Sequence, residues 1–171
     1  MKEEEIYVAV KWWLKRESWD VLGGQPPSGT DHLPVIEIKD DLQAQRGSLG
    51  AYKPDLVAMK GFVVALIECK PNYDFNDHQK LNDVLSSWRR LRSLWSEICL
   101  RYPSGVVSAI EFKDIEFVGI LAHSSVGTVA PLRSVGLLRC AGLSPAEIEL
   151  VPAQSWAANL GSSGSDAAVE G

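Results

Sequence analysis

The chain has 171 residues, 46% of them hydrophobic, which is enough to bury the core of a single domain. Its 22 acidic and 17 basic residues give a formal net charge of −5, which argues against a polycation that coats nucleic acid. No apolar run approaches the roughly 20 residues of a membrane span, and the acidic N-terminal segment lacks the apolar region of a signal peptide.

The first predicted element is a helix from Glu3 to Glu17, where apolar residues recur at helical spacing on one face. Residues 23–30 are rich in glycine and proline, which predicts a loop. Because this loop lies between the first helix and the predicted sheet, it is a candidate to reach toward a substrate. A strand-like stretch from Leu33 to Ile38 and a polar connector at 43–48 follow.

Two short apolar runs in the middle of the chain predict a β-hairpin. They extend from Leu56 to Met59 and from Phe62 to Cys69, with Lys60 and Gly61 as a two-residue turn between them. Both runs are apolar on both faces, which is typical of strands in the middle of a sheet covered on both sides.

This register places an acid pair and a lysine on one face of the hairpin. It sets Asp55 opposite Leu66, and strand alternation puts Glu68 and Lys70 on the same face. Asp55 and Glu68 then become diagonal neighbours across the two strands, with Cβ atoms roughly 7 to 8 Å apart. That separation lets the two carboxylates converge on one ion.

Four further elements are predicted after the hairpin. A helix from Asn76 to Arg101 is followed by strands from Ile115 to Ala122 and from Val135 to Cys140, and Glu147 to Val151 adds a short edge strand. The predicted fold class is therefore α/β, with a central mixed β-sheet of four or five strands flanked by helices.

The acid pair predicts a metal-dependent reaction. Two carboxylates beside an apolar sheet repel each other, and a hard divalent cation removes that conflict. Mg²⁺ prefers oxygen ligands and keeps several waters, which suits Asp55 and Glu68 together with a substrate phosphate; Mn²⁺ is a possible substitute. Lys70 would lie beside the ion, where an ammonium orients or helps deprotonate the attacking water and stabilises charge on the phosphate.

Pro54-Asp55, a spacer of twelve residues and Glu68-Cys69-Lys70 together resemble the PD-(D/E)xK nuclease superfamily, which includes restriction endonucleases and Holliday-junction resolvases. The resemblance covers roughly Glu3 to Tyr102. It implies a restriction-endonuclease-like fold, Mg²⁺ held by Asp55 and Glu68, and a catalytic role for Lys70.

Further site residues are expected around this motif. Members of the superfamily often add a glutamate from the first helix, and Glu3 is favoured among three competing glutamates because it shares the apolar face of that helix. Gln79 and Lys80 resemble the polar residues that related nucleases place on the helix after the lysine. Arg46 and Lys53 are expected to contact nucleic-acid phosphates.

Two other Glu-x-Lys triplets compete with the chosen one, Glu37-Ile38-Lys39 and Glu111-Phe112-Lys113. Neither has a Pro-Asp pair before it at hairpin distance. Both are interpreted as ordinary alternation on exposed strands.

The sequence therefore predicts a Mg²⁺-dependent DNA endonuclease that hydrolyses phosphodiester bonds. The alternative is a catalytically inactive nucleic-acid-binding or scaffolding module of the same fold. One metal site cuts one strand at a time, so cleavage of a duplex predicts a homodimer or a partner subunit.

The domain boundary and the compartment follow from composition. Residues 1–160 are predicted to form a single nuclease-like domain, and the Gly- and Ser-rich residues 161–171 a flexible C-terminal tail. The three cysteines are odd in number and widely spaced in apolar surroundings, as is usual for thiols in a reducing compartment. A cytoplasmic protein without membrane contact is expected.

Overall fold

The computed structural model describes residues 1–29, 31–39, 51–102, 107–125 and 135–153. Residues 161–171, predicted as a tail, lie outside this set.

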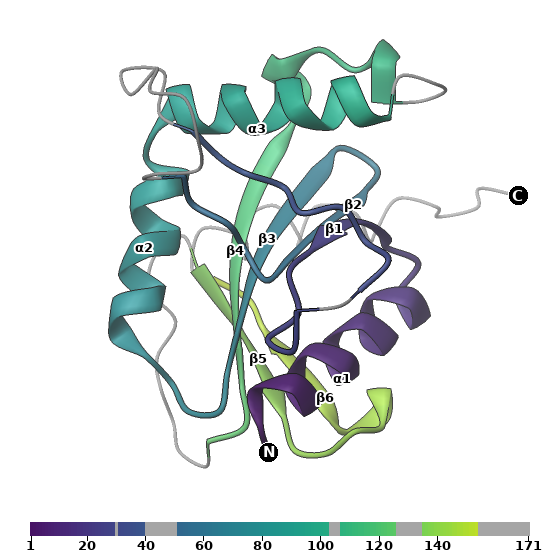
Figure 1. Ribbon diagram of the computed structural model, residues 1–171, viewed down its shortest axis with the longest axis vertical. Coiled ribbons are helices and arrows are strands. Elements are labelled where there is room, and N and C mark those ends of the chain that lie inside the picture. The colour runs from purple at the N-terminus through teal and green to yellow at the C-terminus, as the bar shows by residue number, and fades with distance from the viewer. Residues whose placement is uncertain (30, 40–50, 103–106, 126–134, 154–171) are drawn as a thin grey trace, which may run out of the picture.

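The described residues form a mixed β-sheet flanked by helices, so the predicted α/β class is confirmed (Figure 1). Its six strands follow one another in chain order across the sheet, whereas four or five strands were predicted. Strands β3, β4 and β5 run parallel, and the other neighbours are antiparallel. The strands are β1 (Asp20–Gly24), β2 (Leu56–Lys60), β3 (Val63–Lys70), β4 (Glu116–His123), β5 (Val135–Cys140) and β6 (Ile148–Val151).

The additional strand is β1, and it includes two glycines that the sequence pattern assigned to a loop. A Cβ atom at Gly23 would lie 2.6 Å from the side chain of Ile36, and one at Gly24 would collide with the hydroxyl of Tyr7. Glycine at these positions therefore permits close packing between strand and neighbours. The strand predicted for Leu33 to Ile38 is wrong, because that segment forms no regular strand and contributes an isolated bridge between Ile38 and Tyr52.

The predicted hairpin exists, but its turn is one residue further along the chain. Lys60 pairs with Val63, so Gly61 and Phe62 form the loop. Gly61 has φ +58°, and glycine in the first loop position is typical of a type II′ turn. The predicted pairing of Asp55 with Leu66 is therefore wrong.

The corrected register brings the two acids closer than predicted. Leu56 pairs with Ile67, and one further step along both strands sets Asp55 opposite Glu68. Moving a two-residue turn by one position shifts the facing residues by two, so each side chain keeps its face of the sheet.

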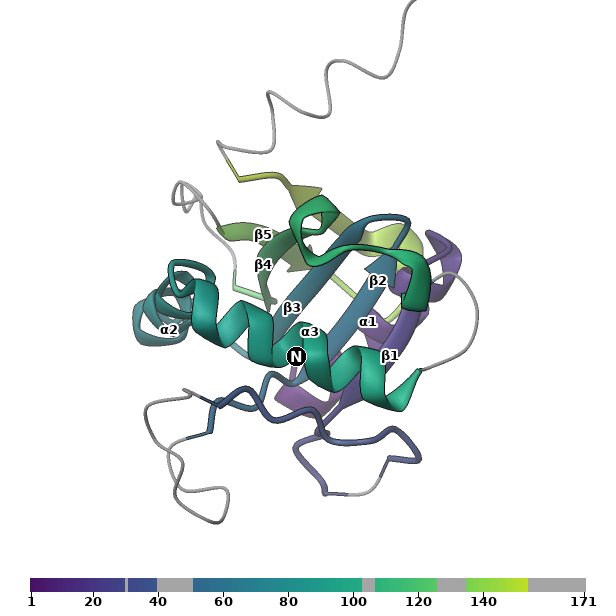
Figure 2. The same cartoon turned by 90° about the horizontal axis from the view of Figure 1, so that it is seen from above.

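Three α-helices cover the sheet within the described residues: α1 (Glu3–Arg16), α2 (Phe75–Leu85) and α3 (Trp88–Arg101). The single helix predicted for Asn76 to Arg101 is wrong, because the chain changes direction sharply between α2 and α3 (Figures 1 and 2). Ser86 donates its hydroxyl to the carbonyl of Asn82 at 2.8 Å, and Ser87 caps α3 by accepting from the N–H of Arg90 at 3.4 Å. Serine competes in this way with helical hydrogen bonding and favours a helix start.

The two faces of the sheet bury separate hydrophobic clusters. Helix α1 packs on one face against Leu56, Ala65 and Ile67, and helices α2 and α3 pack on the other against Val57 and Leu66. Strands β2 and β3 are buried on both faces, as predicted for central strands.

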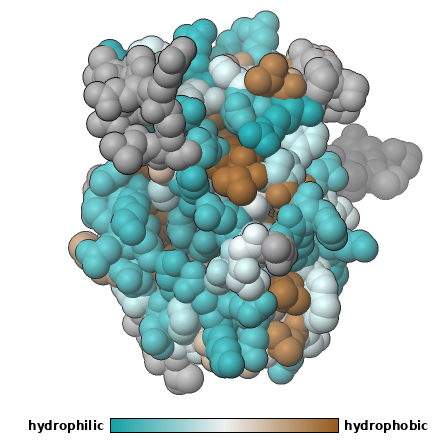
Figure 3. All heavy atoms as spheres, in the orientation of Figure 1, coloured by the Kyte–Doolittle hydropathy of each residue, from teal (hydrophilic) through white to brown (hydrophobic). Residues whose placement is uncertain are grey.

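Hydrophilic side chains cover most of the face drawn in Figure 3, and hydrophobic ones gather there in small patches. No described helix is both long enough and apolar enough to cross a bilayer.

Candidate functional site

The antiparallel hairpin brings the start of β2 beside the end of β3, and this junction carries the predicted acids. Asp55 directly precedes β2, while Glu68 and Lys70 lie in the last three positions of β3. The backbone N–H of Cys69 donates to Oδ2 of Asp55 at 2.7 Å, which fixes the aspartate against the end of β3. The structure thus brings together the three residues that the sequence predicted to converge.

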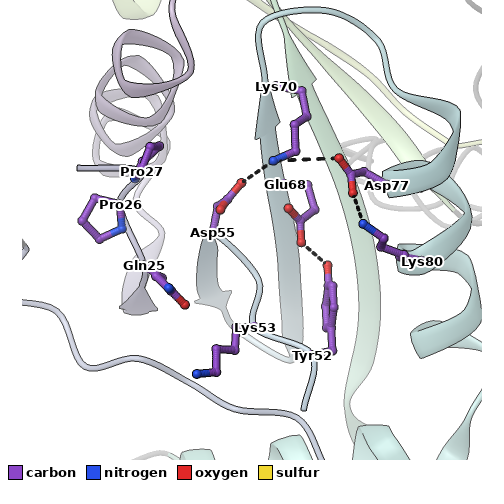
Figure 4. A pocket seen from close by; sticks show the side chains of 10 residues that line it. All are labelled: Gln25, Pro26, Pro27, Tyr52, Lys53, Asp55, Glu68, Lys70, Asp77 and Lys80. Atoms are coloured by element: carbon purple, nitrogen blue, oxygen red, sulfur yellow. Dashed lines mark hydrogen bonds and ion pairs between the residues drawn. The ribbon is translucent and has the colours of Figure 1, made fainter. Parts of the chain in front are cut away.

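These three side chains face a cavity of about 340 Å³ (Figure 4). Its walls come from the loop after β1, the segment before β2, the end of β3 and the first turns of α2. The lining residues are Gln25, Pro26, Pro27, Tyr52, Lys53, Asp55, Glu68, Lys70, Asp77 and Lys80.

The carboxyl group of Glu68 is buried, that of Asp55 is largely buried, and the two lie within hydrogen-bonding reach of each other. Burial, and after it the nearby charge of Asp55, raises the pKa of Glu68 to about 8. Burial also raises the pKa of Asp55, although the N–H of Cys69 and the charge of Lys70 act in the opposite direction. Keeping both groups ionised in this position is therefore unfavourable in the metal-free protein.

Lys70 provides positive charge among several acids. Its Nζ lies 3.1 Å from Oε1 of Glu3, 3.8 Å from Oδ2 of Asp77 and 3.9 Å from Oδ2 of Asp55. Burial lowers the pKa of Lys70, but the charges of Asp55 and Glu3 raise it more, so the net shift is upward. The side chain is therefore an ammonium ion at neutral pH.

The donor set fits a hard divalent cation that keeps part of its hydration shell. Asp55 and Glu68 offer carboxylate oxygens whose mutual repulsion a cation would relieve. Among the described residues, no group of three or more histidine, cysteine, aspartate or glutamate side chains is arranged to hold a metal ion. A cation here would depend on two carboxylates plus water or substrate oxygens, the coordination that Mg²⁺ favours over a closed protein cage.

The other predicted site residues divide into those at the cavity and those elsewhere. Glu3 contacts Lys70, and Lys53 lines the cavity while pairing with Glu37 at 3.0 Å. Gln79 lies on α2 as expected but does not line the cavity, and its amide donates to Asp83 at 3.0 Å. Arg46 lies outside the described residues.

Sequence reasoning named Lys80, which lines the cavity, but missed Asp77 on the same helix as Gln79. Asp77 lies two positions before it and contacts Lys70, and Lys80 pairs with Asp77 at 2.6 Å. Asp77 follows the N-cap residue Asp74, so from sequence it looks like an ordinary acid that complements the helix dipole. Its position seven residues after Lys70, in the first turn of the next helix, is the signal that could have identified it.

The two competing triplets do not form comparable sites. Glu111 and Lys113 pair at 2.7 Å with both side chains more than two-thirds exposed. Glu37 instead supports the cavity from outside through its pair with Lys53.

Comparisons of the chain with family models, with curated proteins and with solved structures found no match.

Proposed function

We propose that the protein is a Mg²⁺-dependent nuclease of the PD-(D/E)xK type, with a restriction-endonuclease-like fold, and that it acts on DNA as an endonuclease. The observation that carries this proposal is the convergence of two carboxyl groups, the buried Glu68 and the largely buried Asp55, beside the ammonium of Lys70 at one end of a central hairpin. Burial raises the pKa of both acids, and Asp55 raises that of Glu68 further, as is typical of acids in the cavity of a functional site.

In this proposal Asp55 and Glu68 hold the cation. A bound Mg²⁺ would lower the pKa of a water ligand and neutralise charge on a phosphate. Each of the two acids already has one oxygen held by a donor from the protein. Asp55 accepts from the N–H of Cys69, and Glu68 accepts from the hydroxyl of Tyr52. Each carboxylate therefore has a second oxygen for the cation.

Lys70 acts through its charge. Because its pKa is raised, it is a poor proton acceptor at neutral pH, and we assign it the role of stabilising negative charge on the phosphate and orienting water. Contacts with Glu3 and Asp77 from two different helices limit where the ammonium can go. The charge is thereby held beside the acid pair.

The remainder of the cavity suits a phosphodiester backbone. Lys53 and Lys80 lie on its wall, and lysines contact phosphates without reading the base sequence. The loop residues Gln25, Pro26 and Pro27 form the opposite side (Figure 4). A substrate strand would lie between this loop and α2.

Cleavage of supercoiled plasmid with Mg²⁺, Mn²⁺ or EDTA tests the proposal. We expect nicked or linear product from the wild type with either metal, and none from Asp55→Asn or Glu68→Ala. Glu111→Ala is a matched control, because it removes an exposed glutamate from a competing Glu-x-Lys triplet. It should cleave as the wild type does.

Two results would count against the nuclease proposal. One is metal-dependent cleavage that persists unchanged in a folded Asp55→Asn protein. The other is a wild type that neither cleaves nor binds Mg²⁺ or Mn²⁺ by calorimetry, which would favour a non-catalytic module. Size-exclusion chromatography of the active protein tests the expected dimer or partner subunit: a monomer that linearises plasmid would contradict it.

A further inference from the structure

The hydroxyl of Tyr52 donates a hydrogen bond to Oε1 of Glu68 at 2.5 Å (Figure 4). This contact joins residues sixteen positions apart, one just before β2 and the other near the end of β3. When Glu68 is ionised, as it would be on binding a cation, a donor bonded to its carboxylate gives a short, charge-assisted hydrogen bond, stronger than one between neutral groups. It therefore restrains the rotation of the Glu68 side chain.

The backbone at Tyr52 is itself fixed by the core. Tyr52 lies outside the regular strands, but its N–H donates to the carbonyl of Ile38 at 2.9 Å and its carbonyl accepts from the N–H of Ile38 at 2.8 Å. Ile38 is 1% exposed and belongs to the cluster beneath α2 and α3, against which the Tyr52 ring also packs. The phenol is thus presented to Glu68 from a supported position rather than from a free loop.

The two acids of the site are restrained in the same manner but by different kinds of donor. Asp55 is held by the backbone N–H of Cys69, which no side-chain substitution removes. Glu68 is held by a side-chain hydroxyl, and its Oε2 remains for another partner. The restraint on Glu68 can therefore be removed alone, with the ring left in place.

We propose that Tyr52 is a positioning residue for Glu68, which holds Oε1 so that Oε2 is available to a divalent cation. This inference rests on the proposed function, because it presumes that Glu68 binds a metal ion. Donors that orient a metal-binding carboxylate typically change metal affinity or activity by about 10- to 100-fold when removed. Tyr52 touches neither the metal nor the substrate in this scheme.

The test is Tyr52→Phe, which removes the hydroxyl and keeps the ring. Mn²⁺ binding is measured by calorimetry without DNA, and plasmid cleavage is measured over a series of Mn²⁺ concentrations. We expect about 10-fold or greater loss of Mn²⁺ affinity, a matching increase in the Mn²⁺ concentration for half-maximal cleavage, and recovery of the rate at saturating Mn²⁺. A merely structural role would lower the rate at every metal concentration and would not move the midpoint.

Tyr102→Phe is the matched control. The hydroxyl of Tyr102 also donates a hydrogen bond, to the carbonyl of Leu22, but this bond lies away from the cavity. Tyr102→Phe should leave the Mn²⁺ midpoint unchanged. If the wild type binds Mn²⁺ and Tyr52→Phe titrates identically, the positioning role is wrong and the nuclease proposal stands. If the wild type neither binds Mn²⁺ nor cleaves, both proposals are wrong.

Discussion

Replacing Glu68 by glutamine should stabilise the metal-free protein while abolishing its proposed activity. Glu68 is 6% exposed and lies beside Asp55, so folding removes an acid from water and places it near a second one. Glutamine keeps the size of the side chain and an oxygen that can accept from Tyr52, but it carries no charge. The substitution therefore relieves the repulsion without opening a cavity.

The magnitude follows from the shift in the pKa of Glu68 from its ordinary value of 4.5 to about 8. At pH 7 the unfolded chain has an ionised Glu68, whereas the folded protein must take up a proton or bear the charge. The difference in the pKa of Glu68 between the unfolded and folded states lowers the free energy of unfolding at pH 7 by about 3 kcal/mol. Because the folded pKa is the higher one, the wild type loses stability as pH rises from about 4.5 to about 8, by about 1.4 kcal/mol per pH unit.

The assay is urea unfolding of both proteins in EDTA at several pH values. The difference in free energy between Glu68→Gln and wild type cancels the contributions of titrating groups that do not interact with Glu68. We expect it to be small near pH 4.5 and to reach about 3 kcal/mol in favour of the variant at pH 7. Glu4→Gln, which removes the same charge from an exposed position, should give almost no difference. A Glu68→Gln protein no more stable than wild type at pH 7, with a difference that does not change with pH, would refute the reasoning.

Three further substitutions test other parts of the structure. Gly24→Ala should lower the free energy of unfolding by about 1 to 3 kcal/mol in urea, because its Cβ would collide with the Tyr7 hydroxyl and press on the carbonyl of Asp55; wild-type stability would contradict this. Lys70→Met should abolish cleavage and destabilise the metal-free protein by about 3 kcal/mol, since three acids lose their cation. The melting temperature of Lys70→Met should rise more with Mg²⁺ than that of wild type. An equal rise would argue against metal binding at the acids beside Lys70. Ser87→Ala should cost about 1 kcal/mol through loss of the cap on α3, with plasmid cleavage unchanged; reduced cleavage would show that the α2–α3 junction influences the site.

Much of the hairpin was predictable because its determinants are local. Two apolar runs beside a glycine specify two strands, and the period of two along a strand puts Asp55, Glu68 and Lys70 on one face. The predicted shared face is correct although the turn was misplaced, because shifting a two-residue loop by one position preserves the face of every side chain. The exact partner of Asp55 was not predictable, since either Lys60-Gly61 or Gly61-Phe62 makes an acceptable turn.

The break between α2 and α3 illustrates a weaker local signal. Ser86 and Ser87 are tolerated inside helices and are also good helix ends, and the apolar spacing continues through them. In the structure, their side-chain hydrogen bonds show that Ser86 lies at the end of α2 and Ser87 at the start of α3.

By itself, the sequence determined the chemistry available to this protein: two acids and a lysine on one face of a central hairpin, with a first helix whose Glu3 shares its apolar side. Only the tertiary structure decided what surrounds them. Glu3 meets Lys70 across 67 positions of the chain, and Asp77 approaches the same ammonium from α2. Tyr52 reaches Glu68 because a bridge to Ile38, outside any regular strand, holds it there. The period of two along a strand depends on neighbouring residues, so it can be predicted from the sequence. Contacts between distant segments depend instead on how helices and loops pack on the sheet, and no short sequence pattern specifies that packing.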